Sequence, residues 1–237
     1  MKARLDNGHN TRSLFPKLLL VFVLLIILLW AAVRAYAAWQ FLAARSITTV
    51  MLESEKVTQA AILDATDRLR QALRVFPNKP EYLELAGQLQ DLQARQPGVV
   101  GKAYREALAS AADFHRRALE VRPLWPYSWA GLLRAKDGLG EIDDEFRLAM
   151  SRSVQTGPQE PSVQLQVIRS GLRHWDVLRA TERAIIEKQV SDALVTQPRL
   201  VFEIIRSYAR PDLICDQAID YRQINQWCAL VNTSDQP

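Results

Sequence analysis

Apolar residues recur at helical spacing along most of the chain, and few positions suggest strands. The stretch from Leu18 to Val33 differs, because its sixteen residues carry no charge, and apolar residues continue beyond Arg34 to Ala44. A helix of about 20 apolar residues crosses a bilayer core, and an arginine near its end can extend to the headgroups. The pattern therefore predicts an all-α chain with a transmembrane helix over residues 18–40.

A proline pair interrupts the rest of the pattern at regular intervals. Such pairs occur at Pro77 and Pro80, at Pro123 and Pro126, and at Pro158 and Pro161, and a single proline follows at Pro198. The first proline of a pair ends a helix because it has no N–H to donate, and the second can open the next helix. The first prolines lie 46, 35 and 40 residues apart, which is typical of stacked helical hairpins of the tetratricopeptide kind.

The chain therefore divides into four expected segments. These are a short basic tail (1–17), a transmembrane anchor (18–40), a helical linker (41–59) and a tetratricopeptide-like α-hairpin solenoid (60–237). The exact number of repeats stays open, because the first step is long and Pro198 has no second proline.

Charges around the apolar helix predict its orientation. The residues before it include the bases Lys2, Arg4, Arg12 and Lys17 and the single acid Asp6. The positive-inside rule then places the N-terminus in the cytoplasm and the helical domain outside. A cleaved signal peptide is the alternative, since Ala35-Tyr36-Ala37 has the small-x-small form of a cleavage site. The length of the apolar run favours an uncleaved anchor.

Composition narrows the class of protein. The chain has 237 residues, 49% of them hydrophobic, and its net charge of +4 comes from interleaved bases and acids, so nucleic acid is not an implied partner. Cys215 and Cys228 are its two cysteines. Outside the cytoplasm they are expected to form a disulfide, whereas the opposite membrane orientation would leave them reduced.

No residue pattern predicts catalysis, a cofactor or a metal. His174 and Asp176 do not face each other at a spacing of two on a helix, and no nucleophile motif is present. The acids Glu141, Asp143, Asp144 and Glu145 suit the first turn of a helix better than a cation site. We therefore expect a protein that is not an enzyme.

One set of aromatic and basic residues is a candidate binding surface. It comprises Trp125, Tyr127, Trp129, Arg116, Arg122 and Arg134. Exposed aromatic rings stack on sugars, and the arginines could hold anionic sugars or acidic partners. The alternative is that the tryptophans fill the seam between hairpins and their indole N–H groups find a carbonyl. Exposure of these rings distinguishes the two interpretations.

The sequence resembles a known family over roughly Ala60 to Cys228. The similar segments are RRALEVRPLWPYSWAGLLRAKDGLGEIDDEF, GPQEPSVQ, GLRHWDVL and QPRLVFEIIRSYARPDLIC, and they resemble the VpsP family of polysaccharide biosynthesis proteins. This resemblance implies a single-pass bacterial inner-membrane protein with a tetratricopeptide-like domain and a role in exopolysaccharide synthesis or export. The resemblance assigns no catalytic residue. We therefore expect a scaffold that binds other proteins of such a complex. The alternatives are a polysaccharide-binding protein and a general envelope adaptor.

Overall fold

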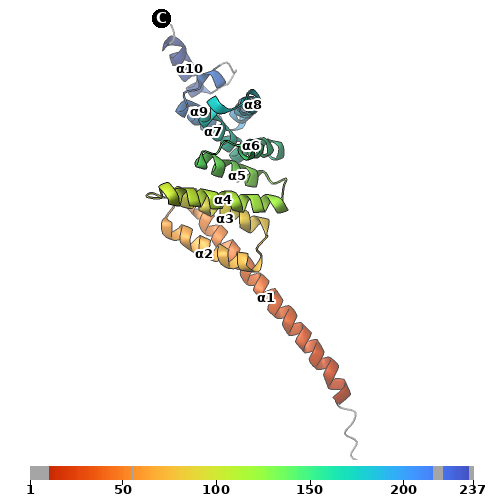
Figure 1. Cartoon of the computed structure of the whole chain (residues 1–237). Helices are drawn as coiled ribbons and strands as arrows, with labels where there is room; N and C mark the ends of the chain where they lie inside the picture. The colour runs from red at the N-terminus through yellow and green to blue at the C-terminus, as the bar shows by residue number, and fades with distance from the viewer. Residues whose placement is uncertain (1–10, 55, 216–220, 235–237) are drawn as a thin grey trace, which may run out of the picture.

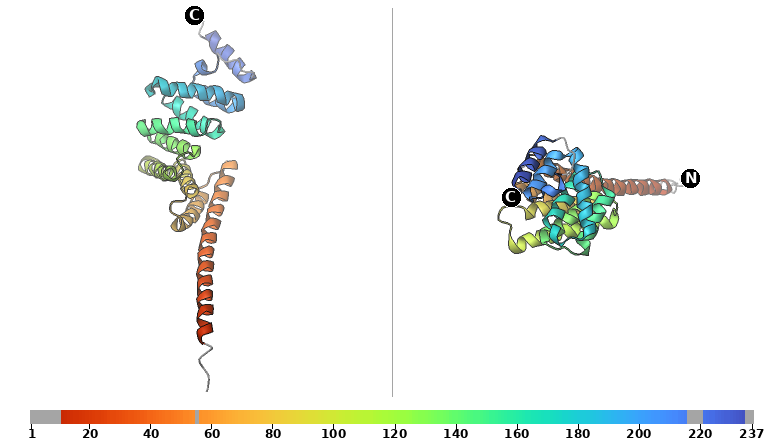
Figure 2. Two further views of the ribbon diagram at one scale, coloured as in Figure 1. Left: turned by 90° about the vertical axis from the view of Figure 1, so that its right-hand side faces the viewer. Right: turned by 90° about the horizontal axis from the view of Figure 1, so that it is seen from above.

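A computed structural model describes residues 11–54, 56–215 and 221–234, and all their regular secondary structure is helical. The α-helices are α1 (Thr11–Glu53), α2 (Gln59–Val75), α3 (Pro80–Ala94), α4 (Gly101–Val121), α5 (Pro126–Leu139), α6 (Asp144–Thr156), α7 (Pro161–Arg173), α8 (Ala180–Thr196), α9 (Pro198–Ser207) and α10 (Arg222–Ser234). Helices α2 to α10 form one stack, and α1 extends away from the end at which α2 lies (Figures 1 and 2). The predicted all-α fold with a long apolar N-terminal helix is confirmed.

Proline residues mark the turns before every second helix of the stack. The prolines in the first turns of α3, α5, α7 and α9 are Pro80, Pro126, Pro161 and Pro198. The helices α2, α4 and α6 each end two residues before another proline, at Pro77, Pro123 and Pro158. A proline ring fixes the backbone for a helix start and cannot continue the helix before it, so these turns follow directly from the sequence.

Helix α1 passes without a break from an exposed segment into the packed stack. Every side chain over residues 16–36 is exposed, whereas Ala37, Ala44 and Met51 are buried, the last two in a core shared with α2 and α3. Residues 41–53 of the expected helical linker are helical, and apolar side chains at helical spacing pack these turns of α1 on the stack. Among the described residues, α1 alone is long and apolar enough to cross a membrane.

Helices α3, α4 and α5 are joined around a buried histidine ring. His115 of α4 is 1% exposed and lies between two glycines, Gly87 of α3 and Gly131 of α5. A Cβ atom at Gly87 would lie 2.6 Å from Nε2 of His115, and one at Gly131 would lie 2.3 Å from its Cε1. Both glycines are therefore needed for this close approach of helices.

Gly131→Ala is expected to lower the free energy of unfolding by about 2 kcal/mol, because the new methyl group would overlap the ring and Gly87 blocks its retreat. Urea unfolding of the full chain in detergent micelles, followed by tryptophan fluorescence, measures the change. The control is the same substitution in a His115→Ala background, where the obstacle is gone and the cost should vanish. An equal cost in both backgrounds would contradict the role of the ring.

The turn between α5 and α6 is held by a buried lysine. The side chain of Lys136 is 3% exposed, and its amine lies 2.6 Å from the carboxylate of Asp143, which also caps α6. Gly140 ends α5 in the left-handed conformation with φ of 72°. Gly138, two residues earlier, is still helical, and it packs closely against Leu108 of α4.

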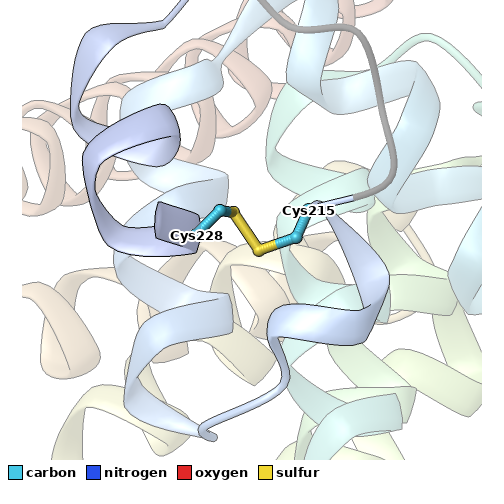
Figure 3. The surroundings of a disulfide bond; sticks show 2 residues. All are labelled: Cys215 and Cys228. Carbon is cyan, nitrogen blue, oxygen red and sulfur yellow. A yellow bond between two sulfur atoms is a disulfide. The ribbon is translucent and has the colours of Figure 1, made fainter. Parts of the chain in front are cut away.

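A disulfide closes the C-terminal end of the stack. Cys215 is bonded to Cys228 in the middle of α10, with their Cα atoms 5.5 Å apart (Figure 3). Helix α10 begins at Arg222, and residues 216–220 lie outside the described residues. The bond thus ties α10 to the chain that leaves the last 3-10 turn.

Candidate functional site

A polar pocket of about 290 Å³ opens between four helices of the stack. Residues of α3, α5 and α7 form most of its wall, and α4 contributes Tyr104 and Leu108. The charged residues in the wall are Asp91, Arg95, Arg134, Asp137, Arg169 and Arg173. We refer to this site as the arginine pocket.

The first of two buried carboxylates joins α3 to α5. The side chain of Asp91 is 8% exposed, and its Oδ2 atom lies 2.9 Å from Nη2 of Arg95 and 2.9 Å from Nε of Arg134. Two guanidinium groups around one carboxylate compensate its charge. Asp91 therefore fixes the positions of two arginines at the rim of the pocket.

The second buried carboxylate joins α5 to α7. The side chain of Asp137 is 5% exposed and accepts hydrogen bonds from Nη1 of Arg173 at 3.0 Å and from the hydroxyl of Ser170 at 3.1 Å. Its other oxygen lies 2.8 Å from Nε2 of His174. These contacts hold Arg173, the third arginine of the wall, against α5.

The pocket keeps positive charge that its own aspartates do not neutralise. Arg169 is exposed and makes no ion pair with any residue that the structure describes. The side chains of Arg95 and Arg173 are 57% and 51% exposed, and a guanidinium has five N–H donors, so most donors stay free. Four arginines against two aspartates suit the pocket to an anion.

Of the six residues predicted as one binding surface, Trp125, Tyr127 and Arg122 are neighbours, with the two rings 5.3 Å apart, and the others lie elsewhere. Arg134 alone lines the arginine pocket. Arg116 forms a bidentate ion pair with Glu145, at 2.6 and 2.8 Å, and these hydrogen bonds hold the pKa of the Glu145 carboxyl below its ordinary value. The side chain of Tyr127 donates to Glu160, and the indole of Trp129 donates to the carbonyl of Pro123 at 2.8 Å.

Trp125 and Arg122 line a second pocket, of about 300 Å³, between α1 and α3. The guanidinium of Arg122 lies 3.8 Å from the centre of the indole ring, and the indole N–H donates to Glu84 at 2.6 Å. Burial raises the pKa of Glu84. Phe41 of α1 supplies another aromatic ring. We refer to this site as the Trp125 pocket.

Several titratable side chains contact one another at the start of α6. The acids expected at the start of α6 lie around basic side chains, since the amine of Lys136 contacts Glu141, Asp143 and Glu145. Among the described residues, no group of three or more acidic, histidine or cysteine side chains is placed to hold a metal ion.

The partner of His174 is Asp137, and sequence reasoning missed this pair because it considered only Asp176 beside it. Ser170 donates to the same aspartate and not to the imidazole, so the three residues do not form an activated nucleophile. A search for acids in register on the preceding hairpin would have found this contact.

Comparison of the chain with protein-family models, with curated proteins and with solved structures finds no match. Its function is therefore inferred from the apolar helix, the two pockets and the resemblance noted from the sequence.

Proposed function

We propose that the chain is a non-enzymatic, membrane-anchored scaffold that binds partner proteins outside the cytoplasm. The observation that carries this proposal is the continuity of α1, in which an exposed apolar segment and a packed segment belong to one helix. Such a helix would hold the stack at a bilayer surface and so raise the effective concentration of any partner in the same membrane. The proposal includes that the stack is a tetratricopeptide-like solenoid.

Contacts near the end of the apolar segment favour an uncleaved anchor. The guanidinium of Arg34 lies 4.4 Å from the ring centre of Trp30 and 4.7 Å from that of Phe76. Tyr36 donates to Gln71 of α2, and Ala37 is buried. Cleavage after Ala37 would remove Arg34 and Tyr36 together with their contacts to Phe76 and Gln71. The intact helix keeps these contacts with the stack, which favours an uncleaved anchor.

The proposed setting is the bacterial inner membrane, with the N-terminus cytoplasmic and the stack periplasmic. The disulfide between Cys215 and Cys228 supports this orientation, because such bonds persist in oxidising compartments. The excess of basic residues before Leu18 supports it independently. The partners proposed from the resemblance are other proteins of an exopolysaccharide synthesis or export complex.

Deletion of this chain in its host is expected to lower polymer output, and full-length protein should restore it. A benzophenone amino acid at Leu124, which is 77% exposed, should form cross-links to a protein of the polymer apparatus. A chain in which an unrelated apolar helix replaces residues 18–33 is the matched control and should also restore output, whereas a secreted stack without an anchor should not. Unchanged polymer after deletion would contradict the proposal.

The Trp125 pocket favours a second candidate, which is binding of polysaccharide. Its wall combines Trp125 with Arg45, Gln88 and two threonines of α1, groups that stack on and hydrogen-bond to sugars. Of the rings predicted for this role, Trp129 donates its N–H to a backbone carbonyl and packs against the core instead. If Trp125→Ala abolishes retention of the host polymer by the purified chain and Trp129→Ala only destabilises it, this candidate is preferred.

A further inference from the structure

We infer that the arginine pocket binds side-chain carboxylates of an acidic segment in a partner protein. This inference rests on the proposed function and names the chemistry by which the scaffold would recognise its partner. The pocket lies where α3, α5 and α7 come together, so its arginines are presented by three separate helices. An extended segment that crosses these helices would meet them one after another.

The positions of the arginines are set before any ligand arrives. Asp91 and Asp137 are nearly buried, and each holds at least one guanidinium at 2.9 to 3.0 Å while leaving further N–H donors of that group unused. Arginines fixed in this way lose little conformational freedom on binding, which favours affinity. Arg169 adds an exposed guanidinium whose charge no described acid compensates.

The planar guanidinium matches a carboxylate, because two parallel N–H groups can donate to its two oxygens. A sugar acid fits the wall less well. Of the described residues that line the pocket, Tyr104 alone is aromatic, and the indole that could stack on a sugar ring lies in the Trp125 pocket instead. Gln166 and Tyr104 provide neutral hydrogen-bonding groups that suit the peptide backbone beside an acidic side chain.

The test uses the full chain in nanodiscs of neutral phosphatidylcholine and a fluorescein-labelled hexaglutamate peptide, with hexaglutamine as the matched uncharged probe. Fluorescence anisotropy should show binding of hexaglutamate only, and binding should weaken as sodium chloride rises from about 50 to about 300 mM. Arg169→Glu should raise the dissociation constant of hexaglutamate about tenfold, because it replaces attraction by repulsion in the pocket.

Arg199→Glu is the matched control, since Arg199 is exposed on α9 and makes no ion pair among the described residues. It should change the dissociation constant by less than about twofold. Arg169 also lacks a structural partner, so both variants are expected to fold, and thermal unfolding verifies this. Equal losses in the two variants, or equal binding of hexaglutamine, would overturn the inference.

Two competitors distinguish other sources of negative charge. Oligogalacturonate carries carboxylates on sugars, and inorganic phosphate is the simplest tetrahedral anion. If either displaces hexaglutamate from the wild-type chain at lower concentration than unlabelled peptide does, the acidic-segment inference is overturned. If the peptide does not bind but cross-links from Leu124 persist in cells, the inference fails and the scaffold function stands. If peptide binding depends on Arg169 but deletion of the chain leaves polymer output unchanged, the inference is supported and the proposed role in polymer production is contradicted.

Discussion

Between pH 7.5 and pH 4 the wild-type chain is expected to lose about 3 kcal/mol more unfolding free energy than a His115→Leu variant loses. The cause is the buried ring between Gly87 and Gly131. Burial, together with the positive charge of Arg134, lowers the pKa of His115 to about 3. Neither of its ring nitrogens has a hydrogen-bond partner among the described residues.

The direction follows from which state binds the proton. In the unfolded chain His115 has an ordinary pKa near 6.5, so below that pH the unfolded state takes up a proton that the folded state rejects until about pH 3. Stability is therefore lost as the pH falls through this window, by about 1.4 kcal/mol per unit, and is unaffected by this group above it. Urea unfolding of both proteins across the window measures the difference.

The comparison with His115→Leu is needed because carboxylates also titrate in acid. Arg116 holds the pKa of Glu145 low, and Arg210 does the same for Asp212, so both acids stabilise the fold less once they are protonated. These contributions are common to both proteins and cancel in the difference. Parallel pH curves for the two chains would mean that the ring is protonated in the folded state, in conflict with its burial.

Local chemistry explains which parts of the fold could be predicted. A proline acts on its own backbone and on the residue before it, so Pro77, Pro123 and Pro158 mark helix ends wherever the chain goes. The exposed apolar segment of α1 was equally visible, because the bilayer requirement concerns only length and composition. The packing of residues 41–53 is not visible in the sequence, because their core partners are on α2 and α3.

Sites that depend on the alignment of hairpins could not be found in this way. Arg134 is near Trp125 in sequence, yet its ion-pair partner is Asp91, a full hairpin earlier. The same holds for Asp137 of α5 and His174, the residue that follows α7. A helical stack brings together residues about one repeat apart, whereas inspection of neighbouring residues favours groups that point in different directions.

Reduction of the Cys215–Cys228 bond is expected to lower the free energy of unfolding by about 3 kcal/mol. The bond closes a loop between residues 13 apart and so restricts the unfolded chain. The loss should be concentrated at the end of the stack, where Trp227 of α10 meets Phe202 of α9 with ring centres 5.7 Å apart. Hydrogen exchange with and without reductant measures it, and α2 and α3 serve as internal controls.

The same bond reports on which side of the membrane the stack lies. In intact cells both thiols of the wild-type chain should resist alkylation until reductant is added, whereas in Cys215→Ser the remaining Cys228 should react without it. That variant shows that the reagent reaches the site, so resistance in the wild type then means a disulfide. Free thiols that react in the wild type only after lysis would place the stack in the cytoplasm. Because the positive-inside prediction, the periplasmic partners and the extra stability of α10 all require the same compartment, this result would overturn the three together.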